Sequence, residues 1–248
     1  MRLIPVIDLK AGEVVRGVGG RREEYRRIET VLTSDITPAG VARAFAVNFP
    51  VRDVYVADLD AIAGSEPNWS AYQAISQSGL RLWIDAGVGD ALRAGDVAAF
   101  AGASVEVVIV GLESIGSPTV LPEILERITP ARAAFSLDLK EGRPLTSTAW
   151  RDATPEDIAA HVASLGFQRL VVLDLAHVGE GRGVAGIDLI RRLRERFPAL
   201  ELIGGGGVRS VADLQTLADA GCNAVLVASA LHDGRLPPRD LASWRVSS

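Results

Sequence analysis

Apolar residues gather along the chain in eight short runs rich in Val, Ile and Leu, and within each run they are continuous rather than alternating with polar residues. Runs of this length and continuity are typical of strands buried on both faces of a parallel sheet. The expected strands span residues 2–9, 54–59, 81–87, 105–111, 133–139, 169–175, 200–206 and 224–230. A further extended segment is expected at 13–17, where "EVVRG" follows the first strand.

Segments with helical spacing lie between these runs. Clear examples are "TPAGVARAFAVN" (37–48), "TPEDIAAHVASLG" (154–166), "GIDLIRRLRERFP" (186–198) and "SVADLQTLADAG" (210–221). Several begin after a capping Ser or Thr, and two have Pro at the first helical position. We therefore predict an α/β fold, a single (β/α)8 TIM barrel over residues 1–248, with an open doubly wound sheet as the alternative.

The two halves of the chain resemble each other. "IDLKAG" (7–12) is matched by "LDLKEG" (137–142), "VYVADLDAIAG" (54–64) by "LVVLDLAHVGEG" (170–181), and "IDAGVGDALRAGDV" (84–97) by "GGGGVRSVADL" (204–214). A four-strand unit written twice indicates two duplicated half-barrels. In a closed barrel this doubling places Asp8 and Asp138 at the ends of strands one and five, opposite each other.

Two carboxylates that face each other across the active-site end of a barrel suit paired proton transfer, with one as acid and one as base. We predict this role for Asp8 and Asp138. The structural alternative is that each Asp caps a turn, with Gly12 and Gly142 supplying a positive φ.

Asp58 and Asp174 also end strands. For these two aspartates, an internal hydrogen-bond network and contact with substrate are both open.

The only two lysines of the chain are Lys10 and Lys140, one in each copy of the repeated motif. Each lysine follows the motif's Asp by two residues, so its ammonium could pair with that carboxylate or with a phosphate of the substrate. Schiff-base chemistry at either lysine, and simple retention after duplication, are the alternatives.

Glycines after the seventh strand, in "GGGGVRS" (204–210), precede a helix and allow backbone N–H groups to approach an anion. We predict a phosphate site at Gly205, Gly206 and Gly207, completed by Ala228 and Ser229 after the last strand; a structural glycine turn is the alternative. The matching positions of the first half carry the carboxylates of Asp85 and Glu113, which would repel a phosphate. One phosphate site is therefore expected, not two.

Composition narrows the functional classes. The net charge of −5 argues against nucleic-acid binding, and the densest basic stretch, "RREEYRR" (21–27), is read as a solvated loop, with an anion-binding loop as the alternative. No apolar run reaches the roughly 18 residues that cross a bilayer, and the single Cys222 fits a reducing compartment. We therefore expect a cytoplasmic protein, and we expect no cofactor. A metal site is not expected either, because the three histidines lie far apart in the sequence and lack the spacing of metal ligands. The oligomeric state is left open.

The chain resembles the HisA/HisF family of histidine-biosynthesis barrels over essentially all 248 residues. "IPVIDLKAGEVVRG", "VADLDAIAG", "SLDLKEGRPLTSTAW", "GGGGVRSVADLQTLADAG" and "VLVASAL" carry the resemblance. It implies an Amadori isomerase in which Asp8 is the general base and Asp138 the general acid. It also implies that Arg16 lies in the first loop, and that Trp150 stacks over a small phosphorylated substrate; ordinary surface packing of Trp150 is the alternative.

The chain departs from the family at the first-half glycines, at the sixth-strand loop "AHVGEGRGVAG", and at Ala228, where glycine is customary. These departures resemble diverged HisA/HisF-related proteins linked to methanopterin-type one-carbon metabolism. The expected function is isomerisation, or a related lyase reaction, of a phosphorylated sugar or sugar-amine. The alternatives are Schiff-base chemistry in one-carbon cofactor biosynthesis, or a catalytically retired ligand-binding barrel.

Overall fold

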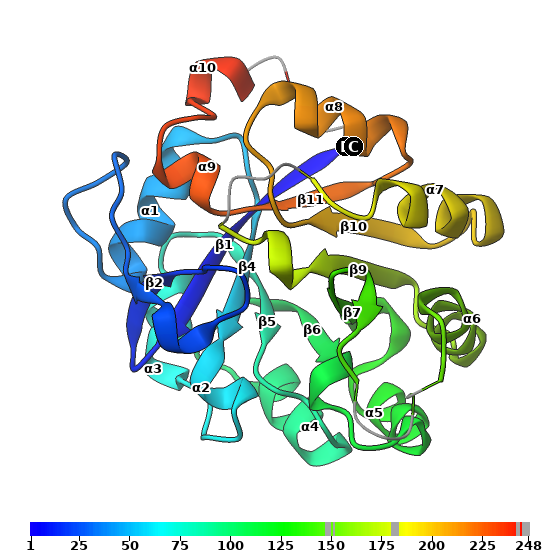
Figure 1. Cartoon of the computed structure of the whole chain (residues 1–248). Coiled ribbons are helices and arrows are strands. Elements are labelled where there is room, and N and C mark those ends of the chain that lie inside the picture. The colour runs from blue at the N-terminus through cyan, green and yellow to red at the C-terminus, as the bar shows by residue number, and fades with distance from the viewer. Residues whose placement is uncertain (147–149, 151, 180–183, 242–243, 245–248) are drawn as a thin grey trace.

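Eight parallel strands form a closed ring in the computed structural model, which describes residues 1–146, 150, 152–179, 184–241 and 244 (Figure 1). The ring strands are β1 (Arg2–Lys10), β4 (Asp53–Asp58), β5 (Arg81–Asp85), β6 (Val105–Gly111), β7 (Ala133–Lys140), β9 (Arg169–Asp174), β10 (Glu201–Gly205) and β11 (Ala224–Val227). Each pairs with the next, and β11 pairs in parallel with β1, which closes the ring. The predicted (β/α)8 barrel is confirmed.

Helices surround the ring, as Figure 1 shows. The longer ones are α1 (Pro38–Asn48), α3 (Trp69–Ser76), α4 (Ala91–Ala99), α5 (Leu121–Ile128), α6 (Pro155–Leu165), α7 (Ile187–Arg196) and α8 (Val211–Asp219). Short helices are α2 (Leu59–Ile62), α9 (Ser229–His232) and α10 (Pro238–Leu241), and 3-10 turns are η1 (Arg22–Glu24), η2 (Leu112–Ser114), η3 (Pro118–Val120), η4 (Pro130–Arg132) and η6 (Leu175–His177). Thr37, Thr154 and Ser210 cap α1, α6 and α8 through their side chains, as the sequence predicts.

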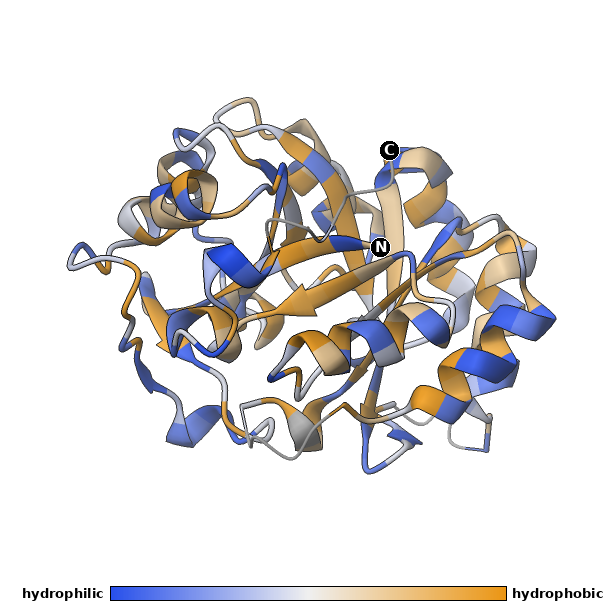
Figure 2. Cartoon of the chain, turned by 90° about the horizontal axis from the view of Figure 1, so that it is seen from above, coloured by the Kyte–Doolittle hydropathy of each residue, from blue (hydrophilic) through white to orange (hydrophobic). Residues whose placement is uncertain are grey.

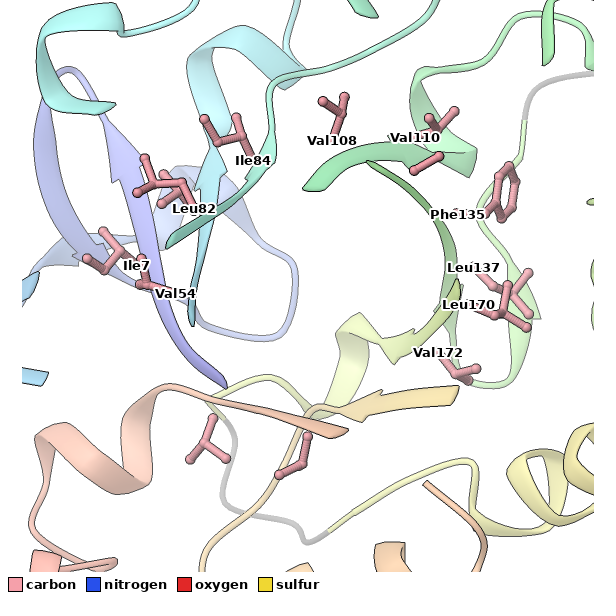
Figure 3. Packing of buried hydrophobic residues seen from close by; sticks show 14 of the residues in the cluster. Ile7, Val54, Leu82, Ile84, Val108, Val110, Phe135, Leu137, Leu170 and Val172 are labelled. Carbon is pink, nitrogen blue, oxygen red and sulfur yellow. The ribbon is translucent and has the colours of Figure 1, made fainter. Parts of the chain in front are cut away.

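Both faces of the strands are apolar because each face is buried against a different layer. Side chains such as Ile7, Leu82 and Val108 belong to the large core cluster that also contains residues of the surrounding helices (Figure 3). Inside the ring, a second cluster includes Trp83 and Ile109. The helices themselves combine apolar and polar positions (Figure 2). These two layers explain why the strand runs in the sequence are continuous.

The repeated motif forms the same hairpin twice. The turn after β1 has Ala11 at φ 51° and Gly12 at φ 76°, and the turn after β7 has Glu141 at φ 52° and Gly142 at φ 76°. Each two-residue turn leads to a short antiparallel strand, β2 (Glu13–Arg16) or β8 (Arg143–Pro144). Two positive φ values identify turns that match the twist of a hairpin and favour glycine at the second position. The repeated glycine is thus required by the backbone.

The strand ends differ in detail from the expectation. The last strand, expected over 224–230, ends at Val227, because Ala228 leaves the strand conformation at φ −118° and ψ −87° and α9 begins at Ser229. The extended segment after the first strand is confirmed as β2, which also pairs with β3 (Arg26–Arg27). Within the described part of the chain, the helices are too short or too polar for a membrane span.

We expect Gly142→Ala to lower the free energy of unfolding by about 1 kcal/mol, because a Cβ disfavours the positive φ of this turn. No atom lies within 4 Å of the position that the new methyl group would take, so backbone strain is the main effect. Gly116→Ala is the matched control, since Gly116 also faces open space but has no positive φ. Denaturation followed by circular dichroism measures both, and equal stabilities of the two variants would contradict this account.

Candidate active site

A cavity of about 950 Å³, open mouth included, lies at the carboxyl ends of the ring strands. Its wall draws on strands and loops from both halves of the chain. The polar and small residues on this wall include Asp8, Arg22, Tyr25, Tyr55, Asp85, Glu113, Asp138, Gly206, Gly207, Arg209, Ala228, Ser229 and Arg235. The end of the barrel predicted from the sequence thus carries a pocket.

Asp8 and Asp138 project into this cavity from opposite sides of the ring. Three strands separate β1 from β7 in either direction around the ring. Neither aspartate ends its strand, since each strand continues for two more residues into its hairpin. Both aspartates therefore lie within strands, which does not agree with the alternative in which each caps a turn. The structure brings the two carboxylates to one cavity.

The two carboxylates have different surroundings. Asp138 is only 5% exposed, and Ser136 Oγ donates a hydrogen bond of 2.7 Å to its Oδ1, whereas its Oδ2 has no partner among the described residues. Asp8 is partly buried and accepts a backbone hydrogen bond from Gly17. A buried carboxyl oxygen without a donor favours the protonated form of Asp138.

Burial raises the pKa of Asp8 to about 7, although the nearby charge of Arg22 opposes this rise. Burial also raises the pKa of Asp138 well above its usual range, and the negative charges of Asp85 and Glu113 add to the effect. Burial thus favours the protonated form of both carboxyls, and the charges of Asp85 and Glu113 favour it further at Asp138. The two carboxyls therefore differ in how strongly their surroundings favour the proton.

Two further carboxylates occupy the cavity wall between β4 and β7. Asp85 ends β5 and accepts a hydrogen bond of 3.1 Å from the hydroxyl of Tyr55, and burial together with Glu113 raises the pKa of Asp85 to about 7. Glu113 follows β6 and forms an ion pair of 2.5 Å with Arg22. We call Asp85 and Glu113, with the adjacent Asp138, the acidic edge.

The first loop, residues 17–25, folds over the cavity. Arg22 and Tyr25 line the pocket, so reading "RREEYRR" as a solvated loop is wrong for these two residues. Lys10 Nζ donates a hydrogen bond of 2.6 Å to the carbonyl oxygen of Arg22, and Gly19 N–H donates one of 2.7 Å to Val178. These bonds anchor the loop and hold the Arg22 guanidinium beside the acidic edge.

Contact between the first and sixth loops depends on a glycine. A Cβ at Gly179 would lie 2.0 Å from the carbonyl oxygen of Gly17, and Gly179 has a φ of 72°. A side chain at this position would therefore push the two loops apart.

The glycine-rich segment lies across the ring from the acidic edge. Gly206, Gly207, Ala228 and Ser229, which the sequence predicts to bind phosphate, all line the cavity after β10 and β11. Gly205 is not among the lining residues; it ends β10, where a Cβ would lie 3.1 Å from Leu226. Arg209 and Arg235 line the same side of the cavity. We call this group of residues the glycine edge.

Asp58 and Asp174 do not line the cavity; both serve internal hydrogen-bond networks. Asp58 caps α2 and accepts bonds of 2.7 Å from the Tyr72 hydroxyl and from the Asn68 N–H. Asp174 accepts from the N–H groups of Glu141 and Gly142, and so holds the second hairpin turn. Of the two interpretations of these residues, the structure supports the hydrogen-bond network.

Four other predicted binding residues also lie away from the cavity wall. The two terminal guanidinium nitrogens of Arg16 donate hydrogen bonds of 2.5 and 2.8 Å to the Asp233 carboxylate. Trp150 is buried in the core, with its ring edge-on to His161 at 5.3 Å between centroids. Lys10 holds the first loop and Lys140 is exposed at the end of β7, so neither lysine is placed for Schiff-base chemistry in this cavity.

Part of the predicted site lies outside the described residues, namely positions 147–149 of "TSTAW" and 180–183 of the sixth-strand loop. His232, which follows β11, is buried and contacts Thr30 at 3.0 Å, and burial lowers the pKa of its imidazole to about 4. Among the described residues, no group of three or more His, Cys, Asp or Glu side chains has the arrangement of a metal site.

The sequence reasoning did not assign Arg22, Tyr25, Tyr55, Arg209 and Arg235 to the site. Tyr55 could have been found, because it lies on a ring strand at an inward-facing position. Arg209 and Arg235 follow the last two strands closely, where barrel loops supply ligand contacts. No local pattern marks Arg22 and Tyr25, whose positions depend on how the first loop packs.

Comparisons with known proteins agree with this architecture. The profile of the histidine biosynthesis protein family matches residues 2–237. A relative from Thermus thermophilus is 31% identical, covering 99% of this chain and all of its own length. A relative from Haloarcula marismortui is 29% identical, covering 94% and 92% of the two chains. Both are named isomerases of an imidazole-4-carboxamide that carries a 5-phosphoribosyl and a 5-phosphoribosylamino group.

An uncharacterised protein of Methanocaldococcus jannaschii is 29% identical, covering 95% of each chain. None of these similarities tests the link to methanopterin-type metabolism, which stays a prediction. The family profile spans the whole ring of strands, and the relatives match over nearly their full lengths. The chain belongs to the histidine biosynthesis protein family.

Proposed function

We propose that this chain is an isomerase that converts a phosphorylated aminoaldose into an aminoketose, with Asp8 as general base and Asp138 as general acid. The observation that carries the proposal is the pair of opposed cavity carboxyls, of which Asp138 has its pKa raised well above the usual range and Asp8 has a pKa of about 7. The names of the relatives support the reaction class and a phosphorylated substrate.

In the proposed reaction, Asp138 gives its proton to the ring oxygen of the sugar, and the nitrogen lone pair forms a C1=N bond as the ring opens. Asp8 then removes the proton from C2, which yields an enolamine. Protonation at C1 and loss of the C2 hydroxyl proton complete the aminoketose. Because atoms and electrons are conserved within the substrate, the two carboxyl groups need only exchange protons.

The glycine edge is proposed to hold the phosphate. Gly206 and Gly207 lack side chains that would keep an anion away from the backbone, and Arg209 and Arg235 bring positive charge to the same wall. The acidic edge opposes a second phosphate because its carboxylates outnumber Arg22. A phosphate at the glycine edge would leave the sugar between Asp8 and Asp138.

We expect Asp8→Asn and Asp138→Asn each to lower kcat at least about 100-fold, because each removes one proton-transfer group while keeping the side-chain shape. The assay uses the relatives' imidazole carboxamide and a panel of N-substituted 5-phosphoribosylamines, and follows ketose formation and deuterium uptake from solvent. Asp96→Asn, an exposed change on α4, is the control. Near wild-type turnover in both cavity variants would refute the assignment.

The pH profile of kcat/KM should be bell-shaped. A base acts in its ionised form, so activity should fall about tenfold per pH unit below the Asp8 pKa of about 7. An acid acts in its protonated form, so activity should also fall at higher pH, where Asp138 loses its proton. A profile that stays flat from pH 5 to pH 7 would rule out Asp8 as the base.

Ser229→Asp should raise KM at least about tenfold with little change in kcat, because the new carboxylate repels a phosphate at the glycine edge. Asp96→Asn, the exposed change on α4, is the control and should leave KM within about twofold, since Asp96 lies outside the cavity wall. Steady-state kinetics at constant ionic strength measure both variants. If the two variants have the same KM, the phosphate lies elsewhere.

A further inference from the structure

We propose, building on the function above, that the substrate carries one phosphate, held at the glycine edge, and a cationic nitrogen at its other end, held at the acidic edge. The nitrogen, a protonated amine or amidine that is distinct from the nitrogen whose lone pair opens the ring, lies against Asp85, with Ser114 Oγ and Asp138 Oδ2 beside it. The acidic edge would then recognise the end of the substrate opposite to its phosphate.

The acidic edge has more carboxyl groups than cationic side chains beside it. The acidic edge holds three carboxyl groups, one at the end of β5, one just after β6 and one on β7, and all three line the cavity. The cation beside them is Arg22, and it is already bound to Glu113 at 2.5 Å. Asp85 has no ion pair among the described contacts; its oxygens accept from the Tyr55 hydroxyl and, weakly, from the Gly87 N–H. A ligand cation would supply the missing counter-charge.

Three side-chain oxygens surround the open space beside Gly111. An ideal Cβ built on Gly111 would lie 3.6 Å from Asp138 Oδ2, 3.6 Å from Ser114 Oγ and 3.9 Å from Asp85 Oδ2. Three oxygens from three different segments therefore converge on one small region. Two of them, Asp138 Oδ2 and Ser114 Oγ, are buried without a hydrogen-bond partner in the described part of the structure.

Buried polar atoms without partners are rare in folded proteins because each costs free energy, so a site with two of them calls for a ligand that supplies hydrogen bonds. Phosphate oxygens would add acceptors and negative charge to a wall that already has both. A cationic nitrogen offers several N–H donors and the opposite charge. Asp85 carries the charge of the pair, which leaves Asp138 its proton for the ring oxygen.

Three non-reacting probes test the proposal by calorimetry at pH 7.5 with EDTA present: 1-amino-1-deoxyribitol 5-phosphate, ribitol 5-phosphate and ribitol 1,5-bisphosphate. They share one phosphate and differ at the far end in carrying an amine, a hydroxyl or a second phosphate. We expect the amine probe to bind at least about tenfold more tightly than the hydroxyl probe, and the bisphosphate to bind most weakly. The proposal would be overturned if the bisphosphate probe bound most tightly. It would also be overturned if the amine probe bound no more tightly than the hydroxyl probe, or if neither of these two probes bound measurably.

Two variants separate charge from space at the acidic edge. Asp85→Asn keeps the shape but removes the charge, and should reduce the advantage of the amine probe to about twofold or less. Gly111→Ala places a methyl group among the three oxygens, and its φ of −80° accepts alanine; it should weaken the amine probe more than the hydroxyl probe. Gly116→Ala adds a methyl in open space and should leave all three affinities unchanged.

The binding test is independent of turnover. Amine preference with unchanged activity of Asp8→Asn would uphold the acidic edge as a cation site and reject the proposed reaction. Loss of activity in Asp8→Asn without any preference of the wild-type protein for the amine probe would uphold the proposed reaction and reject the cation site. If Asp85→Asn weakened the binding of the amine probe and of the hydroxyl probe equally, the result would indicate damage to the fold. That result would count against the cation site.

Discussion

Parallel pairing between the first and last strands of the ring is the contact on which the candidate site depends. Residues Arg2–Pro5 of β1 pair with Ala224–Val227 of β11, and this pairing turns an open sheet into a closed ring. In an open sheet, the ends of β1 and β7 would lie several strand widths apart along one edge. Closure makes them neighbours across a cavity, so carboxylates 130 residues apart in sequence can act on one molecule.

The ring arranges its polar groups along two crossing axes. One axis joins β1 to β7 and carries the aspartates proposed for proton transfer. The other joins Asp85 and Glu113 of the acidic edge, at the ends of β5 and β6, to the glycine edge, after β10 and β11. The first axis is nearly alike at its two ends, with the same hairpin and motif. The second axis has negative charge at one end, and this charge comes from the carboxylates of Asp85 and Glu113.

Much of this arrangement follows from local sequence. Continuous apolar runs predict the strands, and the repeated glycines predict the hairpin turns, because both depend on a residue and its near neighbours. The roles of Asp58 and Asp174 required the structure, since their donors lie up to 33 residues away. Arg22 and Tyr25 were missed because the packing of a whole loop on distant segments positions them. The family resemblance placed Trp150 over the ligand, yet the structure buries it beside α6.

The sign difference between the two edges has a geometrical consequence. Two half-barrels of similar design are related by a rotation of about half a turn, so a site with matching edges would accept a ligand with matching ends in either of two orientations. Only one of those orientations presents the reacting carbon to Asp8. An acidic edge facing a glycine edge removes this ambiguity, and every binding event then starts with the ligand facing the same way.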